Sequence, residues 1–116
     1  MYEYRATLLR VLDGDTIEVD LDLGFHIHYR AFVRMAGYDA PELRTDAGFK
    51  AKECLYQLLH ELPAPLVIRT MINKEFEKYG RVLGAVMVGS ININTAMVKA
   101  GHVKPPPGAV TRRNRR

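Results

Sequence analysis

Hydrophobic and polar residues alternate along the first 36 positions, and this alternation predicts three consecutive antiparallel strands. The first strand is predicted over residues 2–11. Asp13-Gly14 follows it and is a hairpin signal, because glycine accepts the positive φ of tight turns. Residues 16–21 alternate strictly and predict a second strand, which Gly24 ends. A third strand is predicted from Phe25 to about Ala36, with an apolar face of Phe25, Ile27, Tyr29, Ala31, Val33 and Met35 and an opposite face of Arg30, Phe32 and Arg34.

The period changes after residue 45, where apolar residues recur at spacings of three and four and predict an amphipathic helix. Its apolar stripe is formed by Ala51, Cys54, Leu55, Leu58, Leu59 and Leu62. Thr45 or Asp46 is expected to cap the start of this helix, and Pro63 and Pro65 end it. Cys54, the single cysteine, is interpreted as a small core residue, and one cysteine allows neither an intramolecular disulfide nor a Cys-based zinc site.

Two more strands, over residues 66–72 and 81–88, are predicted on either side of a polar connection. A short second helix follows, with Asn94 as the expected cap and Gly101 as its end. Five short strands with a helix between the third and fourth match the Greek-key barrel called the OB-fold. The expected fold class is therefore mainly β (α+β), a five-stranded OB-fold barrel with two helices.

One domain is expected over residues 4–104, because the run Pro105-Pro106-Pro107-Gly108 continues neither a helix nor a central strand. Residues 105–116 are then a Pro-rich and basic tail. The net charge of +4 suits a nucleic-acid partner, although a basic terminal run is also typical of a solvated tail. The first residues lack a secretory signal, so a cytoplasmic location is expected, with secretion or phage origin left open.

Charged residues that suit phosphate chemistry lie at the predicted strand ends. Asp15 follows the first hairpin turn, Asp39 and Glu42 follow the third strand, Arg34 lies on that strand, and Arg81 begins the fifth. Two acids from separate strand ends can hold a hard cation, and a third can orient or deprotonate a water molecule. Two arginine side chains can neutralise the charge of a phosphodiester in its transition state.

Each of these signals has an ordinary structural interpretation when it stands alone. Asp13-Gly14-Asp15 is most often a turn, an arginine on a strand most often faces solvent, and acids favour helix N-termini. His26 and His28 share one strand face and suit a transition metal, but a half-polar face is the favoured interpretation.

The combination of motifs resembles the staphylococcal nuclease (thermonuclease) family over residues 9–103. The motifs occur in the family's order: Val11-Leu12-Asp13-Gly14-Asp15-Thr16, Arg34 five residues before Asp39-Ala40-Pro41-Glu42, Gly48 and Ala51, Lys78-Tyr79-Gly80-Arg81, and the helix from Asn94 to Gly101. Several motifs in the right order are far more specific than any one of them.

The resemblance implies an OB-fold barrel that hydrolyses DNA and RNA phosphodiesters with one Ca²⁺ ion, breaking the 5′ O–P bond to leave 3′-phosphates. It implies metal ligands at Asp15, Asp39 and the Ala40 carbonyl, catalytic roles for Arg34, Glu42 and Arg81, and substrate contacts at Lys78 and Tyr79. The expected partners are single-stranded or locally melted DNA and RNA, with no membrane and with a monomeric state.

Three departures from the family pattern affect the expectation. The loop between Glu42 and Gly48 is shorter than in the staphylococcal enzyme, Glu77 stands where the prototype has Asp, and the prototype's third, C-terminal helix is absent. The alternative function is a noncatalytic OB-fold module that binds nucleic acid or protein. Such scaffolds generally lack the full set of acids and arginines, which this sequence retains.

Overall fold

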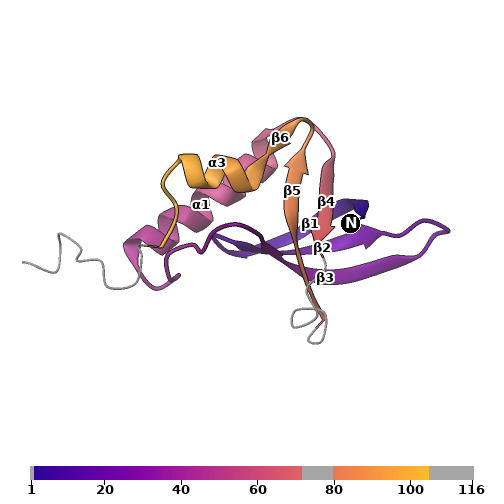
Figure 1. Cartoon of the computed structure of the whole chain (residues 1–116), viewed down its shortest axis with the longest axis horizontal. Helices are drawn as coiled ribbons and strands as arrows, with labels where there is room; N and C mark the ends of the chain where they lie inside the picture. The colour runs from indigo at the N-terminus through magenta and orange to yellow at the C-terminus, as the bar shows by residue number, and fades with distance from the viewer. Residues whose placement is uncertain (1, 72–79, 105–116) are drawn as a thin grey trace, which may run out of the picture.

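The computed structural model describes residues 2–71 and 80–104, and in it five strands close into a barrel (Figure 1). These strands are β1 (Glu3–Asp13), β2 (Thr16–Asp22), β3 (His28–Met35), β4 (Leu66–Met71) and β5 (Arg81–Val88). They pair in the order β3-β2-β1-β4-β5 through antiparallel ladders, and a parallel pairing of β3 with β5 closes the ring. The predicted five-stranded barrel is therefore confirmed.

The third strand is shorter than predicted, because the segment at its expected start forms a turn. Gly24, Phe25 and His26 have φ values of 84°, 55° and 61°, which are left-handed and incompatible with a strand. The Asp22 carboxylate accepts a hydrogen bond from Gly24 N at 2.9 Å and supports this turn. Phe25 is 95% exposed, so its predicted place on an apolar strand face is wrong.

The long helix α1 (Asp46–Glu61) begins where the change of period predicts. Of the two expected caps, Thr45 has the role: its hydroxyl accepts a hydrogen bond from Gly48 N at 3.0 Å. The buried face of α1 packs against β1 and contributes Ala51 and Leu55 to the core.

The second helix, α3 (Ile93–Lys99), has its N-cap two residues earlier than predicted, at Asn92 in place of Asn94. Asn92, at the end of the two-residue strand β6 (Ile91–Asn92), accepts the capping hydrogen bond from Thr95 N at 3.1 Å. Asn94 is instead buried, and its amide links three backbone groups: it accepts from Val86 N at 3.0 Å and donates to Ala36 O at 2.8 Å and to Gly84 O at 3.2 Å. The predicted cap at Asn94 is wrong, and this side chain ties α3 to the barrel.

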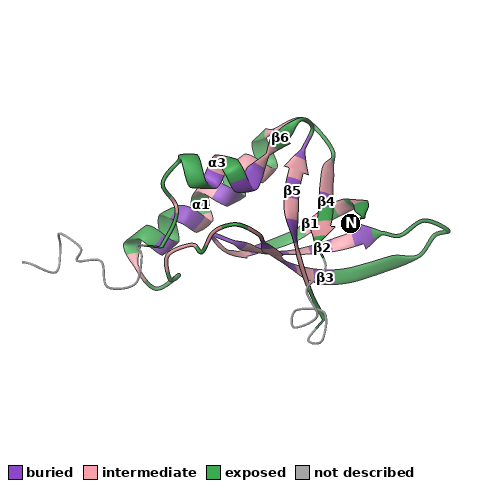
Figure 2. Cartoon of the chain, in the orientation of Figure 1, coloured by how far each residue is buried: buried purple, intermediate pink, exposed green. Residues whose placement is uncertain are grey.

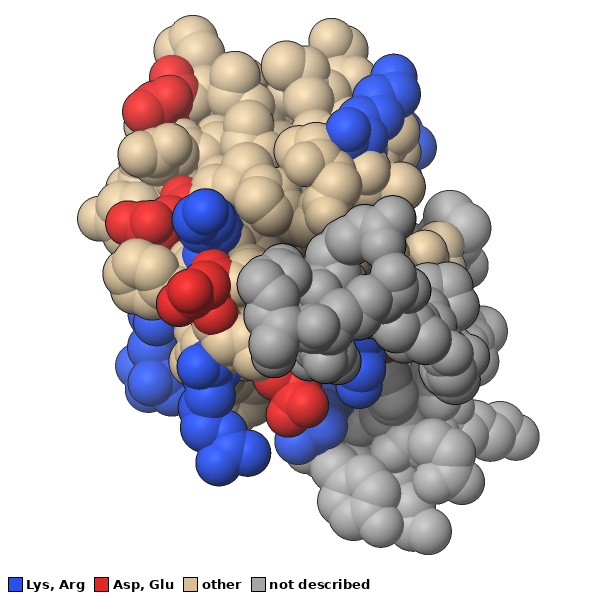
Figure 3. All heavy atoms as spheres, turned by 90° about the vertical axis from the view of Figure 1, so that its left-hand side faces the viewer, with Lys and Arg blue, Asp and Glu red and all other residues tan. Residues whose placement is uncertain are grey.

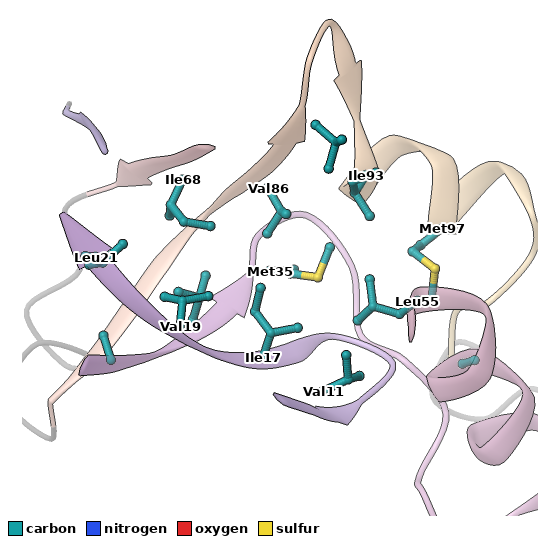
Figure 4. Packing of buried hydrophobic residues seen from close by; sticks show 14 residues of the cluster. Val11, Ile17, Val19, Leu21, Met35, Leu55, Ile68, Val86, Ile93 and Met97 are labelled. Atoms are coloured by element: carbon teal, nitrogen blue, oxygen red, sulfur yellow. The ribbon is translucent and has the colours of Figure 1, made fainter. Parts of the chain in front are cut away.

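The hydrophobic core fills the space between the barrel and the two helices (Figures 2 and 4). Strand residues Ile17, Val33 and Met35 meet Leu55 of α1 and Met97 of α3, and all of these are fully buried. Cys54 packs at the edge of this core as predicted, and burial raises the pKa of its thiol. Among the residues that the structure describes, no helix is long and apolar enough to cross a membrane.

Candidate active site

The turn between β1 and β2 delivers a buried carboxylate to the rim of the barrel. Asp15 is 8% exposed, and both of its carboxylate oxygens have partners. Oδ1 accepts from the Thr16 hydroxyl at 3.0 Å, and Oδ2 accepts from Ala40 N at 2.7 Å. Burial and the neighbouring Asp13 raise the pKa of Asp15, while the Ala40 N–H and the Arg34 guanidinium oppose this rise. A nearby positive charge stabilises the ionised form of a buried acid of this kind.

Arg34, near the end of β3, supplies that charge and is held in a defined orientation. Its Nη1 donates to two backbone carbonyl oxygens, Met35 O at 2.6 Å and Tyr38 O at 2.9 Å. Its Nη2 lies 3.3 Å from Asp15 Oδ2 and also bonds to the carboxylate of Asp39. Two acids that are 24 residues apart in the sequence therefore converge on one guanidinium nitrogen.

The turn that carries Asp15 is fastened to the segment after β3. The Tyr38 hydroxyl donates to Gly14 O at 2.7 Å, and burial raises the pKa of this phenol, so it remains a protonated donor. A methyl group added at Gly14 would lie 2.7 Å from the Cβ atoms of both Ala40 and Ala51. Only glycine lets the turn pack this closely against both neighbours, so Gly14 sets the position of Asp15 relative to Ala40.

Arg81 joins this group from the start of β5. A pocket of about 380 Å³ is lined by Asp15, Arg34 and Arg81 together with Leu12, Asp13, Thr16 and Phe32. The parallel pairing of β3 and β5 sets Arg81 beside Phe32. The pocket thus combines two arginines with a buried acid, which is an arrangement that suits an oxyanion.

Glu42 lies outside this pocket, on the loop between β3 and α1. It is exposed and lines a second cleft, of about 340 Å³, with Pro41, Lys50, His102 and Lys104. Its backbone carbonyl accepts from Thr45 N at 3.0 Å and from the Thr45 hydroxyl at 2.7 Å. An added methyl group at Gly48 would lie 1.8 Å from Glu42 O, so α1 and this loop are in direct backbone contact. The loop backbone is fixed, whereas the carboxylate is presented to solvent.

A backbone hydrogen bond also links the segment after β3 to the segment after α3. Lys104 N donates to Asp39 O at 2.6 Å, so the segment after α3, which lines the cleft, is attached to the residue that pairs with Arg34. Figure 3 shows the end of the molecule that carries the start of α1. Acidic and basic side chains are intermixed on the visible part of this face.

The donor set at the rim suits a hard cation. Asp15 Oδ2 and Asp39 Oδ1 already converge on a positive group, and carboxylate and carbonyl oxygens are the ligands that Ca²⁺ and Mg²⁺ prefer. The described residues contain no group of three or more His, Cys, Asp or Glu side chains arranged to hold a metal. A cation here would therefore have two carboxylates and the predicted Ala40 carbonyl, and water would complete its shell.

The structure brings together Asp15, Arg34, Asp39 and Arg81 of the predicted site, and it places Glu42 in the adjoining cleft. Lys78 and Tyr79 lie outside the described residues. His28 Nδ1 lies 3.2 Å from Asp20 Oδ2. His26 has a left-handed φ of 61° and lies in the turn before β3, so the expectation that His26 and His28 share one strand face is wrong. Tyr38 was not among the predicted site residues, and its position directly before Asp39 was the available signal.

Comparisons with known proteins identify the family. The family model described as "Staphylococcal nuclease homologue" matches residues 32–105, more than half of the chain. The chain belongs to the staphylococcal nuclease homologue family.

Relatives of this staphylococcal nuclease homologue include Protein ParB of Escherichia coli, 33% identical over 111 residues, 85% of this chain and 55% of that protein. Micrococcal nuclease of Shigella flexneri is 32% identical over 108 residues, which cover 85% of this chain and 56% of that protein. An uncharacterized endonuclease of Escherichia coli is 35% identical over 100 residues, which cover 85% of this chain and 59% of that protein. The chain therefore spans a little over half the length of these relatives.

Proposed function

We propose that this chain is a metal-dependent nuclease that hydrolyses phosphodiester bonds of DNA and RNA without selecting the sugar. The observation that carries the proposal is the convergence of Asp15, Asp39 and Arg34 at one point, with Arg81 in the same pocket. A guanidinium that is held by two backbone carbonyls and paired with two carboxylates is fixed in its orientation, and phosphoryl transfer requires preorganised charge of this kind. Membership of the family and the names of two relatives, a micrococcal nuclease and an endonuclease, support the same activity.

In this proposal Arg34 and Arg81 hold the scissile phosphate from β3 and β5, and they stabilise the charge that builds on its oxygens. They act as electrostatic groups, since an arginine side chain does not give up its proton at ordinary pH. Glu42 orients the attacking water and accepts its proton as the water approaches phosphorus in line. The 5′ oxygen leaves and takes a proton from solvent, so the products are a 3′-phosphate and a free 5′-hydroxyl.

The acids at the rim have a different task from Glu42. Asp15, Asp39 and the Ala40 carbonyl would hold one Ca²⁺ ion, which when bound contributes charge neutralisation at the phosphate. Asp15 is suited to this role because its buried carboxylate stays fixed by Ala40 N and Thr16. Asp39, whose side chain is 75% exposed, is the adaptable ligand of the pair.

We further propose that the substrate is single-stranded or locally melted and that the chain acts as a monomer in the cytoplasm. The pocket that holds Arg34 and Arg81 and the cleft that holds Glu42 are both small, and an extended strand is the form of substrate expected to lie across them.

One assay tests the proposal: the purified chain is incubated with single-stranded DNA in Ca²⁺, in Mg²⁺ and in chelator. Cleavage in Ca²⁺ that chelator abolishes, with 3′-phosphate ends on the products, is the expected result. Arg81→Ala should lower the rate by about 10²-fold or more, because it removes one stabilising group from the transition state. Arg69→Ala is the matched control, since Arg69 is exposed on β4 and pairs with Glu3. Cleavage that persists in chelator or in Arg81→Ala would overturn the mechanism.

The noncatalytic OB-fold module remains the second candidate. It has no use for an ion between Asp15 and Asp39, so calorimetric titration with Ca²⁺ distinguishes the two functions. Binding of nucleic acid with no heat of Ca²⁺ binding and no cleavage would favour the module.

A further inference from the structure

The pocket that holds Arg34 and Arg81 also has an apolar wall. Five of its lining residues are charged or polar, and the other two, Leu12 and Phe32, are apolar. A site that binds only a phosphate has no need of an aromatic ring beside its arginines. We propose that Phe32 is a stacking platform for the nucleobase next to the scissile phosphate; this inference rests on the proposed function.

The position of Phe32 relative to the two arginines fits this role. Phe32 and Arg34 are two residues apart on the same face of β3, so their Cα atoms are about 7 Å apart. Phe32 is also the direct register partner of Arg81 across the parallel β3–β5 ladder. A phosphate held between the two guanidinium groups would therefore place an attached base within reach of the ring.

The ring is half-buried and supported by neighbouring charged side chains. The Arg10 guanidinium carbon lies over it, 6.0 Å from the ring centroid, and Arg10 is itself held by Glu18 through an Nε–Oε1 contact of 2.7 Å. Glu18 is the cross-strand partner of Phe32 on β2. An aromatic ring that is braced in this way loses little freedom when a base stacks on it, which favours binding.

Stacking on an aromatic ring predicts a particular kind of substrate preference. Every nucleobase has a π-face, so the subsite would require a base and would accept any of the four. Such a site suits a nuclease that does not select sequence. Removing the ring should weaken binding of a normal strand and leave unchanged the binding of a strand without bases.

The test compares Phe32→Ala, Phe32→Tyr and the unaltered chain. Binding of a fluorescein-labelled oligothymidylate and of an abasic oligomer of equal length is measured by anisotropy in chelator. Base–aromatic stacking contributes about 1–3 kcal/mol, so Phe32→Ala should weaken oligothymidylate binding by about 5- to 150-fold. The abasic oligomer should bind the variant and the unaltered chain equally, and Phe32→Tyr should restore binding. The salt dependence should not change, because no charge is removed.

The matched control is Phe49→Ala, which removes a 56% exposed phenylalanine from α1, outside the pocket. It should leave both affinities unchanged. An equal loss of affinity for both oligomers would show that Phe32 acts only through the fold, and no loss for either would show that its ring is not used. Both results overturn the inference.

Failure of this inference is distinguishable from failure of the proposed function. Ca²⁺-dependent cleavage that is accompanied by no base-dependent loss in Phe32→Ala removes the stacking platform alone. A base-dependent loss of binding in a chain that never cleaves removes the nuclease and leaves the platform in place.

Discussion

Two regions that meet at the rim of the barrel hold their acids in different ways. In the turn region, which comprises Asp13–Thr16 and Arg34, each charged side chain is fixed by others, and the buried Asp15 carboxylate has partners on both oxygens. In the loop region, residues 41–45, the backbone is fixed by Thr45 and Gly48, and the Glu42 carboxylate is exposed. Stability and function are therefore coupled in the first region and separable in the second.

The difference follows from the cost of burying charge. A carboxylate removed from water must be paired and hydrogen-bonded, so Asp15 constrains the turn around it. An exposed carboxylate has no such requirement, and a water-activating group needs access to water. The molecule therefore places one proposed metal ligand, Asp15, where neighbouring groups hold its side chain, and its proposed base, Glu42, where the carboxylate reaches solvent.

The largest effect is expected from Arg34→Ala, which acts on the turn region. The change leaves buried Asp15 without its counter-charge and two carbonyl oxygens without their donor. We expect kcat/KM to fall by more than about 10²-fold and the free energy of unfolding to fall by about 2 kcal/mol or more. Hydrolysis assays and urea unfolding measure the two quantities. Arg34→Lys keeps the charge but not the forked guanidinium, so both quantities should lie between those of Arg34→Ala and the unaltered chain. An unchanged unfolding midpoint in Arg34→Ala would show that stability and function are not coupled in the turn region.

Glu42→Gln, in the loop region, should lower kcat/KM by about 10²-fold while the unfolding free energy stays within about 0.5 kcal/mol of the unaltered chain. The reason is that its exposed carboxylate is not part of a buried network. The same two assays apply, with Glu53→Gln on the exposed surface of α1 as a control that should change neither. A substantial loss of stability in Glu42→Gln would show that the two regions are alike.

Gly48→Ala tests whether the loop backbone positions Glu42. The added methyl group would lie 1.8 Å from Glu42 O, so the loop must move. A shift of about 1 Å in a catalytic group can lower the reaction rate by up to about 10²-fold. We therefore expect kcat/KM to fall by about 10-fold to 10²-fold. Glu53→Ala is the control, since Glu53 is exposed on the same helix and its truncation adds no atom near Glu42. Normal activity in Gly48→Ala would mean that Glu42 does not depend on this contact.

Tyr38→Phe should have the smallest effect. It removes only the hydroxyl that donates to Gly14 O at 2.7 Å, so the unfolding free energy should fall by about 1 kcal/mol. Activity should fall by a few fold at most, because Ala40 N still holds Asp15. Chemical denaturation and the hydrolysis assay measure both, and a loss as large as that of Arg34→Ala would place Tyr38 among the essential groups of the turn region.

Most of the fold could be predicted because the hydrophobic residues of each strand and helix recur at the spacing typical of that element. The alternation of Ile17, Val19 and Leu21 and the spacing of Ala51, Leu55 and Leu58 are local properties, and burial follows them closely. The failures occurred where one residue type suits two environments. Asn94 can cap a helix or link buried backbone groups, and Phe25 continues an alternating pattern while its backbone turns.

The sequence by itself determined the set of charged groups at the candidate site, because Asp15, Arg34, Asp39 and Arg81 stand at strand ends that a barrel brings to one rim. Only the tertiary structure decided which of them touch. It paired one Arg34 nitrogen with both acids, placed Phe32 in the same pocket as the two arginines and set Glu42 in a separate cleft. The physical reason is that these contacts depend on the closure of β3 against β5 and on the close approach of Gly14 and Gly48 to their neighbours, and neither is a property of a single strand or helix.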